Sequence, residues 1–239
     1  MDYTIPPEVR IYHVAGTQHG SGDILQQPPA VMPRPPINCQ LSVNPNSYVP
    51  VQRALLVALQ EWIVKGLEPP ASRYPTLGNK SLVSASEIKY PYMPAVHFAV
   101  SGVAARRVLY DRGPKYRQAD TSGIIAEPPI PGKAYALLLP QVDADGNDVG
   151  GLRNTTMQVP LGTYLGWNVR KTGFSEGNSC DLTAGFIPFF KTKADRLAAN
   201  DPRPRLKNDT RRMTTMSGKS PRRRRNWSTT VCSYNRMRI

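Results

Sequence analysis

His19 is the residue of this chain whose surroundings best fit proton-transfer chemistry. It lies in a loop between Gly16 and Gly20, after the apolar run Val9–Val14. That run is rich in β-branched and aromatic residues and is bounded by prolines and a glycine, which predicts a buried strand. A histidine in a short loop after a strand can combine a fixed backbone with a solvent-facing imidazole, as a general base near neutral pH requires. The alternative is a plain surface histidine, and for His13, inside the run, a structural role is favoured.

A second pattern that could carry chemistry is Gly173–Gly177, whose sequence GFSEG matches the G-x-S-x-G nucleophile elbow. The elbow needs a buried strand before it and a helix after it, so that the serine sits on a strained turn. The residues on either side have no helical periodicity. We interpret the match as a chance pattern in a glycine-rich loop, and we do not expect Ser175 to be a nucleophile.

The element that follows the histidine loop is a helix predicted over residues 51–65. Lys65 stands in its last turn, and Gly66 is placed to end it in the left-handed conformation. The residues 44–48, NPNSY, offer cap and turn residues just before the helix. Apolar residues recur at helical spacing: Val51, Ala54, Leu55, Ala58, Leu59, Trp62 and Ile63.

Five segments between Ile5 and Pro204 carry a family resemblance. They are VRIYHVAGTQHG, QRALLVALQEWIVKGLEPPASRYP, LLLPQVDADGNDVGGLR, VPLGTYLGWNVR and CDLTAGFIPFFKTKADRLAANDPRP. In this order they resemble the C-terminal part of a family of large bacterial α/β-hydrolase-domain proteins. The resemblance implies an α/β fold class, in which this chain supplies the C-terminal piece of an α/β-hydrolase: the last strand, the histidine loop and the last helix.

The same resemblance implies a function for His19. In such hydrolases the GTQHG histidine is expected to be the base of a Ser-His-acid triad that acts on an ester or amide, with no cofactor or metal. The chain order there is nucleophile, acid, histidine, so the serine and the acid are expected before residue 1. We therefore predict a fragment that is inactive alone and whose partner is the missing N-terminal hydrolase segment. Its small-molecule ester or amide substrate would belong to the parent enzyme.

The pattern of breaks divides the chain into four parts. We predict the end of the hydrolase core over residues 1–66, a linker over 67–95, a β-rich C-terminal region over 96–204 and a disordered basic tail over 205–239. Within the β-rich region, residues 133–142 are predicted to form a strand. Asp145-Gly146 favours a hairpin turn, and the surrounding acidic residues lack the glycine and acid positions of a calcium loop. A weak capping box at Thr192 and Asp195 predicts a short helix before Pro202.

The charge of +14 is concentrated at the C-terminus, where residues 203–239 contain 12 Lys and Arg against one Asp. An arginine run such as Arg222–Arg225 binds phosphates or anionic surfaces electrostatically, so the alternative function is a non-enzymatic binding module with this tail. However, residues from Arg211 onward can be translated back into GC-rich codons and read in the neighbouring frame. That frame encodes apolar residues at helical spacing, and its sequence resembles the ending expected for the family. We therefore predict a frameshift between about Leu206 and Arg211, and no specific nucleic-acid partner.

Two further features leave the location of the chain undetermined. The cysteines, Cys39, Cys180 and Cys232, are odd in number and have no metal-binding spacing. No apolar run is long enough to span a membrane, and no signal peptide is visible. We therefore predict no membrane span and assign no compartment.

Overall fold

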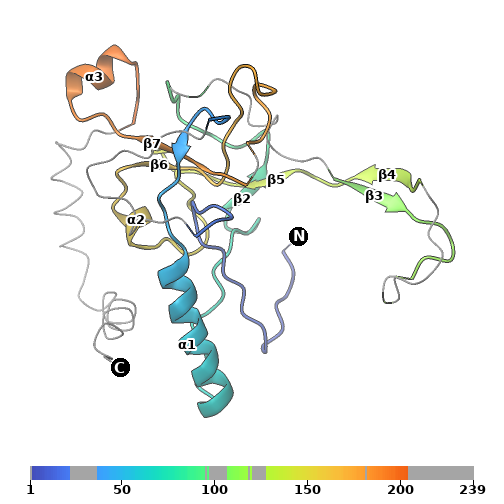
Figure 1. The fold of residues 1–239 in the computed structure, drawn as a ribbon. Coiled ribbons are helices and arrows are strands. Elements are labelled where there is room, and N and C mark those ends of the chain that lie inside the picture. The colour runs from blue at the N-terminus through green and yellow to red at the C-terminus, as the bar shows by residue number, and fades with distance from the viewer. Residues whose placement is uncertain are drawn as a thin grey trace.

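The computed structural model describes residues 2–21, 37–94, 96, 107–117, 119, 128–180 and 182–203. Within these residues the helices are α1 (Val49–Lys65), α2 (Thr155–Gln158) and α3 (Lys193–Ala198). The strands are β1 (Ser42–Val43), β2 (Leu82–Ser84), β3 (Val108–Asp111), β4 (Ile130–Ala134), β5 (Leu138–Pro140), β6 (Gly162–Tyr164) and β7 (Gly185–Pro188). Figure 1 shows that α1 extends from one side of the β-rich body, and that the β3–β4 ribbon projects from another.

The strands form three small antiparallel sheets. One has the order β1-β7-β6, and the others are the pairs β2-β5 and β3-β4. In the three-stranded sheet, Phe186 of β7 lies opposite Ser42 on one side and Tyr164 on the other. The described residues thus contain no parallel sheet, and the only parallel pairings among them are two isolated bridges.

These two bridges replace the buried strand that the sequence predicts over Val9–Val14. Tyr12 pairs with Arg73 and Val14 pairs with Leu152, so each partner segment supplies only one pairing. The side chains of Val9 and Ile11 are 40% and 39% exposed. The prediction of a buried strand is therefore wrong: the segment is extended, but one of its faces remains open.

The interior is built around the three-stranded sheet. One cluster joins Ala15 to α2 and to the strands β6 and β7, through Met157, Tyr164 and Phe186. A second cluster contains Leu41, Met93, Leu165 and Ile187, with Tyr90, Val96 and Trp167 against it. Segments that are far apart in sequence are thus packed beside the turn that precedes His19.

A disulfide between Cys39 and Cys180 closes this body across 141 residues of sequence. Both cysteines are buried. No local pattern in the sequence predicts this pairing, and Cys232 lies outside the described residues. A covalent link that closes so long a loop strongly restricts the unfolded chain, which is the main way a disulfide stabilises a fold.

Helix α1 confirms the predicted helix and its end. Gly66 is left-handed, with φ of 67°, and its N–H donates to the carbonyl of Trp62 at 3.0 Å. The start differs from the expectation, because the N-cap residue is Tyr48 and it makes no side-chain capping bond. The asparagines before the helix are used elsewhere, as described below.

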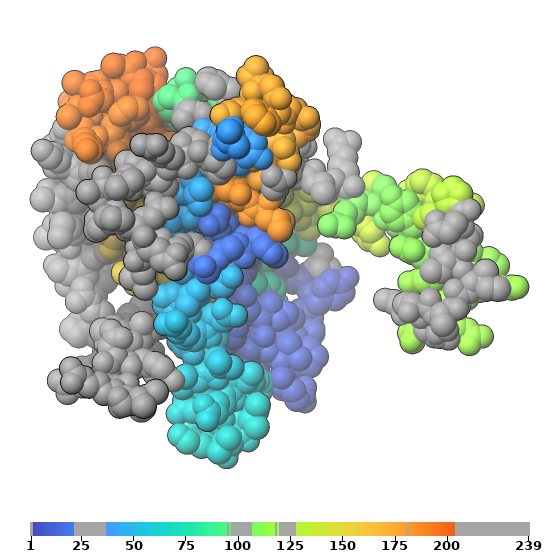
Figure 2. Space-filling model, in the orientation of Figure 1, coloured from blue at the N-terminus to red at the C-terminus, as the bar shows by residue number. Residues whose placement is uncertain are grey.

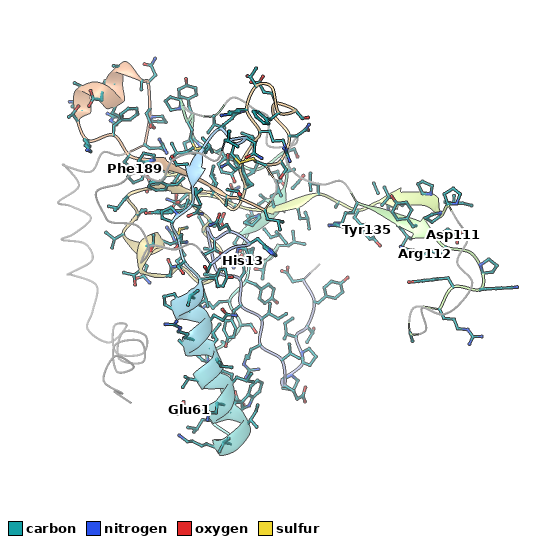
Figure 3. All side chains as sticks on the ribbon, in the orientation of Figure 1. His13, Glu61, Asp111, Arg112, Tyr135 and Phe189 are labelled. Carbon is teal, nitrogen blue, oxygen red and sulfur yellow. A yellow bond between two sulfur atoms is a disulfide. The ribbon has the colours of Figure 1, made fainter. Side chains whose placement is uncertain are left out.

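The helix leaves an apolar surface uncovered. Leu56, Ile63 and Val64 are 66%, 76% and 73% exposed, and no residue of α1 is fully buried. Figure 3 shows Glu61 at the far end of the helix, away from the packed body. The covered side of α1 faces the N-terminal segment, where the guanidinium of Arg10 lies 4.9 Å from the ring of Trp62.

Several smaller predictions also have structural counterparts. The predicted linker carries β2, which pairs with β5, and a buried Met93, while the division into domains stays a prediction. The predicted strand over 133–142 is divided between β4 and β5. Thr192 caps α3 by accepting a hydrogen bond from the Asp195 N–H at 3.1 Å, which confirms the cap and the short helix before Pro202. The Thr192 hydroxyl donates to the carboxylate of Asp195 at 2.6 Å.

The C-terminal boundary of the described body is an ion pair. The guanidinium of Arg203 donates to the carboxylate of Asp201 at 2.6 Å, and both side chains are only 1% exposed. Arg203 also donates to the hydroxyl of Thr163 at 2.8 Å. Arg203 therefore belongs to the folded body and not to the basic C-terminal residues, although its charge contributes to the excess over residues 203–239.

The predicted basic tail over 205–239, with its arginine run, lies outside the described residues, and so does the proline-rich segment 22–36. Among the described residues no helix is both long and apolar enough to cross a membrane. Figure 2 shows the described body in space-filling form, with the β3–β4 ribbon standing apart from it.

Candidate active site

The candidate site is the turn that carries His19 at its end. Gly16 has a φ of 58°, and a Cβ placed on it would lie 2.8 Å from the side chain of Met157. Both the backbone conformation and the lack of space require glycine at this position. The hydroxyl of Thr17 donates to the carbonyl of Val14 at 2.8 Å, which closes the turn on the extended segment.

Two buried asparagines hold the carbonyl of Gly16. The side-chain amide of Asn44 donates to it at 2.8 Å, and the amide of Asn46 donates to it at 3.0 Å. Both side chains are 0% exposed. Asn44 also donates to the carbonyl of Leu165 at 2.8 Å and accepts from the Asn46 N–H at 2.8 Å, so the two asparagines act as one connected clamp. We call this pair the asparagine clamp.

The N–H of Gly16, in the preceding peptide unit, is held by a carboxylate. Oδ2 of Asp148 accepts the N–H of Gly16 at 2.9 Å and lies 3.8 Å from Nε2 of His13. Gly151 approaches the carbonyl of His13 so closely that a Cβ there would lie 2.4 Å from that oxygen. His13 is therefore fixed by its surroundings, in agreement with the structural role that the sequence favours.

Gln18 and Tyr48 fix the end of the turn. The amide of Gln18 donates to the carbonyl of Asn44 at 3.3 Å, and its oxygen accepts the N–H of Ala184 at 3.0 Å. The phenol of Tyr48 donates to the carbonyl of His19 at 3.4 Å. The backbone is thus held up to His19, while His19 itself is exposed.

This arrangement suits an imidazole that must meet a group from elsewhere. A fixed backbone reduces the entropy lost when the side chain is oriented, and exposure lets it exchange protons. Among the described residues no hydrogen bond to the imidazole of His19 is present; its recorded contact is through its backbone carbonyl. The site therefore presents a candidate base, without a described nucleophile or acid beside it.

Ser175 lies in an exposed loop between Val169 and Ser179, which are joined by an isolated antiparallel bridge. Its φ is 62°, but turns and bends surround it rather than a strand and a helix. The loop lacks the flanking elements that a nucleophile elbow needs. The geometry agrees with the interpretation of GFSEG as a chance match.

The acidic turn near Asp143 is a hairpin turn. Oδ1 of Asp143 accepts the N–H groups of Asp145 and Asn147 at 3.0 Å, and Oδ2 accepts from Arg153 at 3.1 Å. Gly146 has a φ of 77°. In the part of the chain that the structure describes, no group of three or more His, Cys, Asp or Glu residues is placed to hold a metal ion.

Three tyrosines have phenol pKa values above the usual value of a tyrosine. Burial raises the pKa of the Tyr90 phenol well above its usual range, and the nearby charge of Asp148 acts in the same direction. Burial also raises the pKa of Tyr164 and of Tyr12. All three are neutral near pH 7, where they act as hydrogen-bonding groups rather than as charges.

Sequence reasoning missed the residues that hold the turn. The NPNSY segment predicts only a helix start, whereas Asn44 and Asn46 bind the carbonyl of Gly16. The acidic residues that follow Asp143 predict only a turn, whereas Asp148 among them accepts the N–H of Gly16. Asparagines are common in turns, so only their burial, which the sequence does not display, distinguishes these two.

The family model described as an alpha/beta hydrolase domain matches residues 2–200. This match covers most of the chain, so the protein is hydrolase-like in class. The chain belongs to the alpha/beta hydrolase domain family. The family prediction from the sequence is confirmed. The comparisons with curated proteins and with solved structures found no match.

Proposed function

We propose that this chain provides the general base, His19, of a serine hydrolase that transfers an acyl group from an ester or amide to water. The observation that carries the proposal is the anchored turn, which fixes the backbone from Gly16 to His19 and leaves the imidazole exposed. Family membership supports the same reaction class.

In this mechanism a serine attacks the acyl carbon while His19 takes its proton. His19 then returns the proton to the leaving group and afterwards activates water in the same way. An aspartate or glutamate orients the imidazole, and backbone N–H groups stabilise the oxyanion. Of these groups, we assign only His19 to this chain.

The serine, the acid and the oxyanion hole would come from a hydrolase segment that precedes His19 in chain order. Two open surfaces support such a partner. The apolar face of α1 carries Leu56, Ile63 and Val64, which are well exposed. In the extended segment, the N–H and C=O of Tyr12 make no hydrogen bond to any described residue, so this segment offers an unpaired edge to another strand.

The first test is the hydrolysis of 4-nitrophenyl acetate by the purified chain. We expect no turnover above that of free imidazole, because His19 has no hydroxyl to activate. Turnover that disappears in His19→Ala would contradict the need for a separate segment. Turnover that disappears in Ser175→Ala would instead make the GFSEG loop a nucleophile.

The second test is the DNA sequence of the locus. We expect an upstream frame that encodes a strand, a G-x-S-x-G motif and a helix, together with an insertion or deletion near codons 206–211. A gene that contains no such segment would contradict the proposal. A single open frame through Ile239 would make the basic tail genuine and would favour the second function, salt-dependent binding of phosphate backbones by the arginine run.

A further inference from the structure

A cavity of about 370 Å³ lies between the histidine turn and the first half of α1. Its wall is formed by Tyr12, His13, Val14 and Thr17 from one segment and by Tyr48, Gln52 and Leu55 from the other. Figure 3 shows His13 beside the N-terminal end of α1. The volume lies within the range of pockets that bind small molecules.

The cavity is connected to His19 through two of its wall residues. Tyr48 donates its phenol proton to the carbonyl of His19 at 3.4 Å. Thr17 lies two residues before His19, within the anchored turn, and its hydroxyl is fixed on the carbonyl of Val14. A molecule in this cavity would therefore lie close to the residue that we assign as the base.

The wall chemistry selects an uncharged occupant. None of the wall residues is Asp, Glu, Lys or Arg. The Nε2 of His13, on the wall, lies 3.8 Å from the carboxylate of Asp148. A charged ligand would therefore find no residue of opposite formal charge on the wall, whereas an uncharged ligand needs none.

The same wall offers two kinds of favourable contact. The phenol rings of Tyr12 and Tyr48, with Val14 and Leu55, provide apolar and ring surface. The side-chain amide of Gln52 provides a donor and an acceptor. The hydroxyls of Thr17 and Tyr48 already donate to backbone carbonyls, so they can only accept a hydrogen bond from a ligand. This mixture suits a flat ring that carries a neutral hydroxyl or ester oxygen.

We propose that this cavity binds the uncharged, ring-bearing part of the substrate on which His19 acts. The proposal rests on the proposed function for its link to catalysis. The binding itself does not depend on the proposed function, because His19 is not one of the wall residues. The substrate class is thus a neutral aromatic or similar cyclic ester or amide.

The test is titration of the full chain with three probes of one shape, followed by NMR: benzyl alcohol, benzoate and benzylammonium. We expect saturable binding of benzyl alcohol, with a Kd on the order of millimolar, and at least tenfold weaker binding of both ions. Absence of saturable binding, or equal binding of the ions, overturns the proposal.

Two pairs of variants locate the binding. Leu55→Trp fills the cavity and should weaken benzyl alcohol binding at least tenfold, whereas Leu56→Trp, at the exposed neighbouring position, should change it less than twofold. Gln52→Glu places a negative charge on the wall at an exposed position that tolerates it. It should raise benzylammonium affinity at least fivefold, and the exposed Gln60→Glu should not. Equal effects within either pair overturn the proposal.

His19→Ala separates this proposal from the proposed function. We expect His19→Ala to keep benzyl alcohol binding within twofold. In the complete hydrolase, Leu55→Trp should raise KM for a benzyl ester with little change in kcat. If the probe binds but His19 proves dispensable for hydrolysis, the proposed function fails and the binding site remains. If His19 is essential but no probe binds, the cavity proposal alone fails.

Discussion

Replacement of Asn44 by alanine should destabilise the fold and loosen the histidine turn. The variant removes two donated bonds, to the carbonyls of Gly16 and Leu165, and one accepted bond from the Asn46 N–H. Each bond contributes about 1 kcal/mol net, and each buried group left without a partner costs about 1–3 kcal/mol. Gly16 keeps its bond from Asn46, so the loss falls on the other two groups. The free energy of unfolding should decrease by about 2–6 kcal/mol.

The assay is urea unfolding of the full chain, followed by circular dichroism, with amide exchange as a local readout. We expect the Gly16 N–H, which donates to Asp148, to exchange faster in Asn44→Ala. The matched control is Asn178→Ala, because Asn178 is exposed and its hydrogen bonds with described residues are made by its backbone. Its effect should stay within about 0.5 kcal/mol. A loss below about 1 kcal/mol in Asn44→Ala, or one equal to the control, would refute the asparagine clamp.

Three further predictions concern stability. Burial raises the pKa of Tyr90, so above about pH 10 the unfolded state loses this proton first and the free energy of unfolding falls as pH rises. Tyr90→Phe should reduce that fall, and an unchanged dependence of the free energy of unfolding on pH between about pH 9 and 11 would contradict the prediction. The disulfide Cys39–Cys180 joins residues 141 positions apart, so its reduction should lower the free energy of unfolding by about 2–5 kcal/mol. The unfolding midpoint should fall on reduction, Cys180→Ala should reproduce the fall, and Cys232→Ala should not. Gly16→Ala places a methyl group in occupied space at a φ of 58°, so it should destabilise by at least about 2 kcal/mol; a smaller loss in thermal unfolding would show that the turn adapts.

Local patterns predicted the local elements. Helix α1 and its left-handed Gly66, the cap at Thr192 and the turn at Gly146 all follow from residues within one or two turns of each other. Such features depend on backbone propensity and on short-range hydrogen bonds, which neighbouring residues determine. His19 was recognised in the same way, from glycines and a preceding apolar run, and its catalytic role stays a prediction.

Contacts between distant segments could not be predicted. Asn44 reaches Gly16 across 28 residues and Leu165 across 121, and no local pattern distinguishes a buried asparagine from one in a turn. The segment Val9–Val14 has strand-forming residues, but its pairing depends on Arg73 and Leu152, which supply one bridge each. The disulfide could not be predicted for the same reason, since Cys39 and Cys180 are 141 residues apart in sequence and lie close to the paired strands β1 and β7.

The open face of α1 connects these findings to function. A helix whose covered side packs on the N-terminal segment and whose other side exposes leucine, isoleucine and valine is unusual in a protein that acts alone. The proposed hydrolase segment would cover that face and would bring a serine to the exposed imidazole. If the tail is out of frame, removal of residues 205–239 should change neither the binding of the proposed hydrolase segment to α1 nor the activation of its serine by His19.

The most direct test of the proposed base is the rate of serine labelling by a fluorophosphonate probe, measured on this chain produced together with the proposed hydrolase segment. The probe reports activation of the nucleophile and requires no knowledge of the substrate. We expect His19→Gln to slow labelling by about a thousandfold or more, while His97→Gln, which removes another imidazole of the chain, leaves the rate within twofold. Equal labelling of the His19→Gln and unsubstituted proteins would contradict the assignment of His19 as the general base.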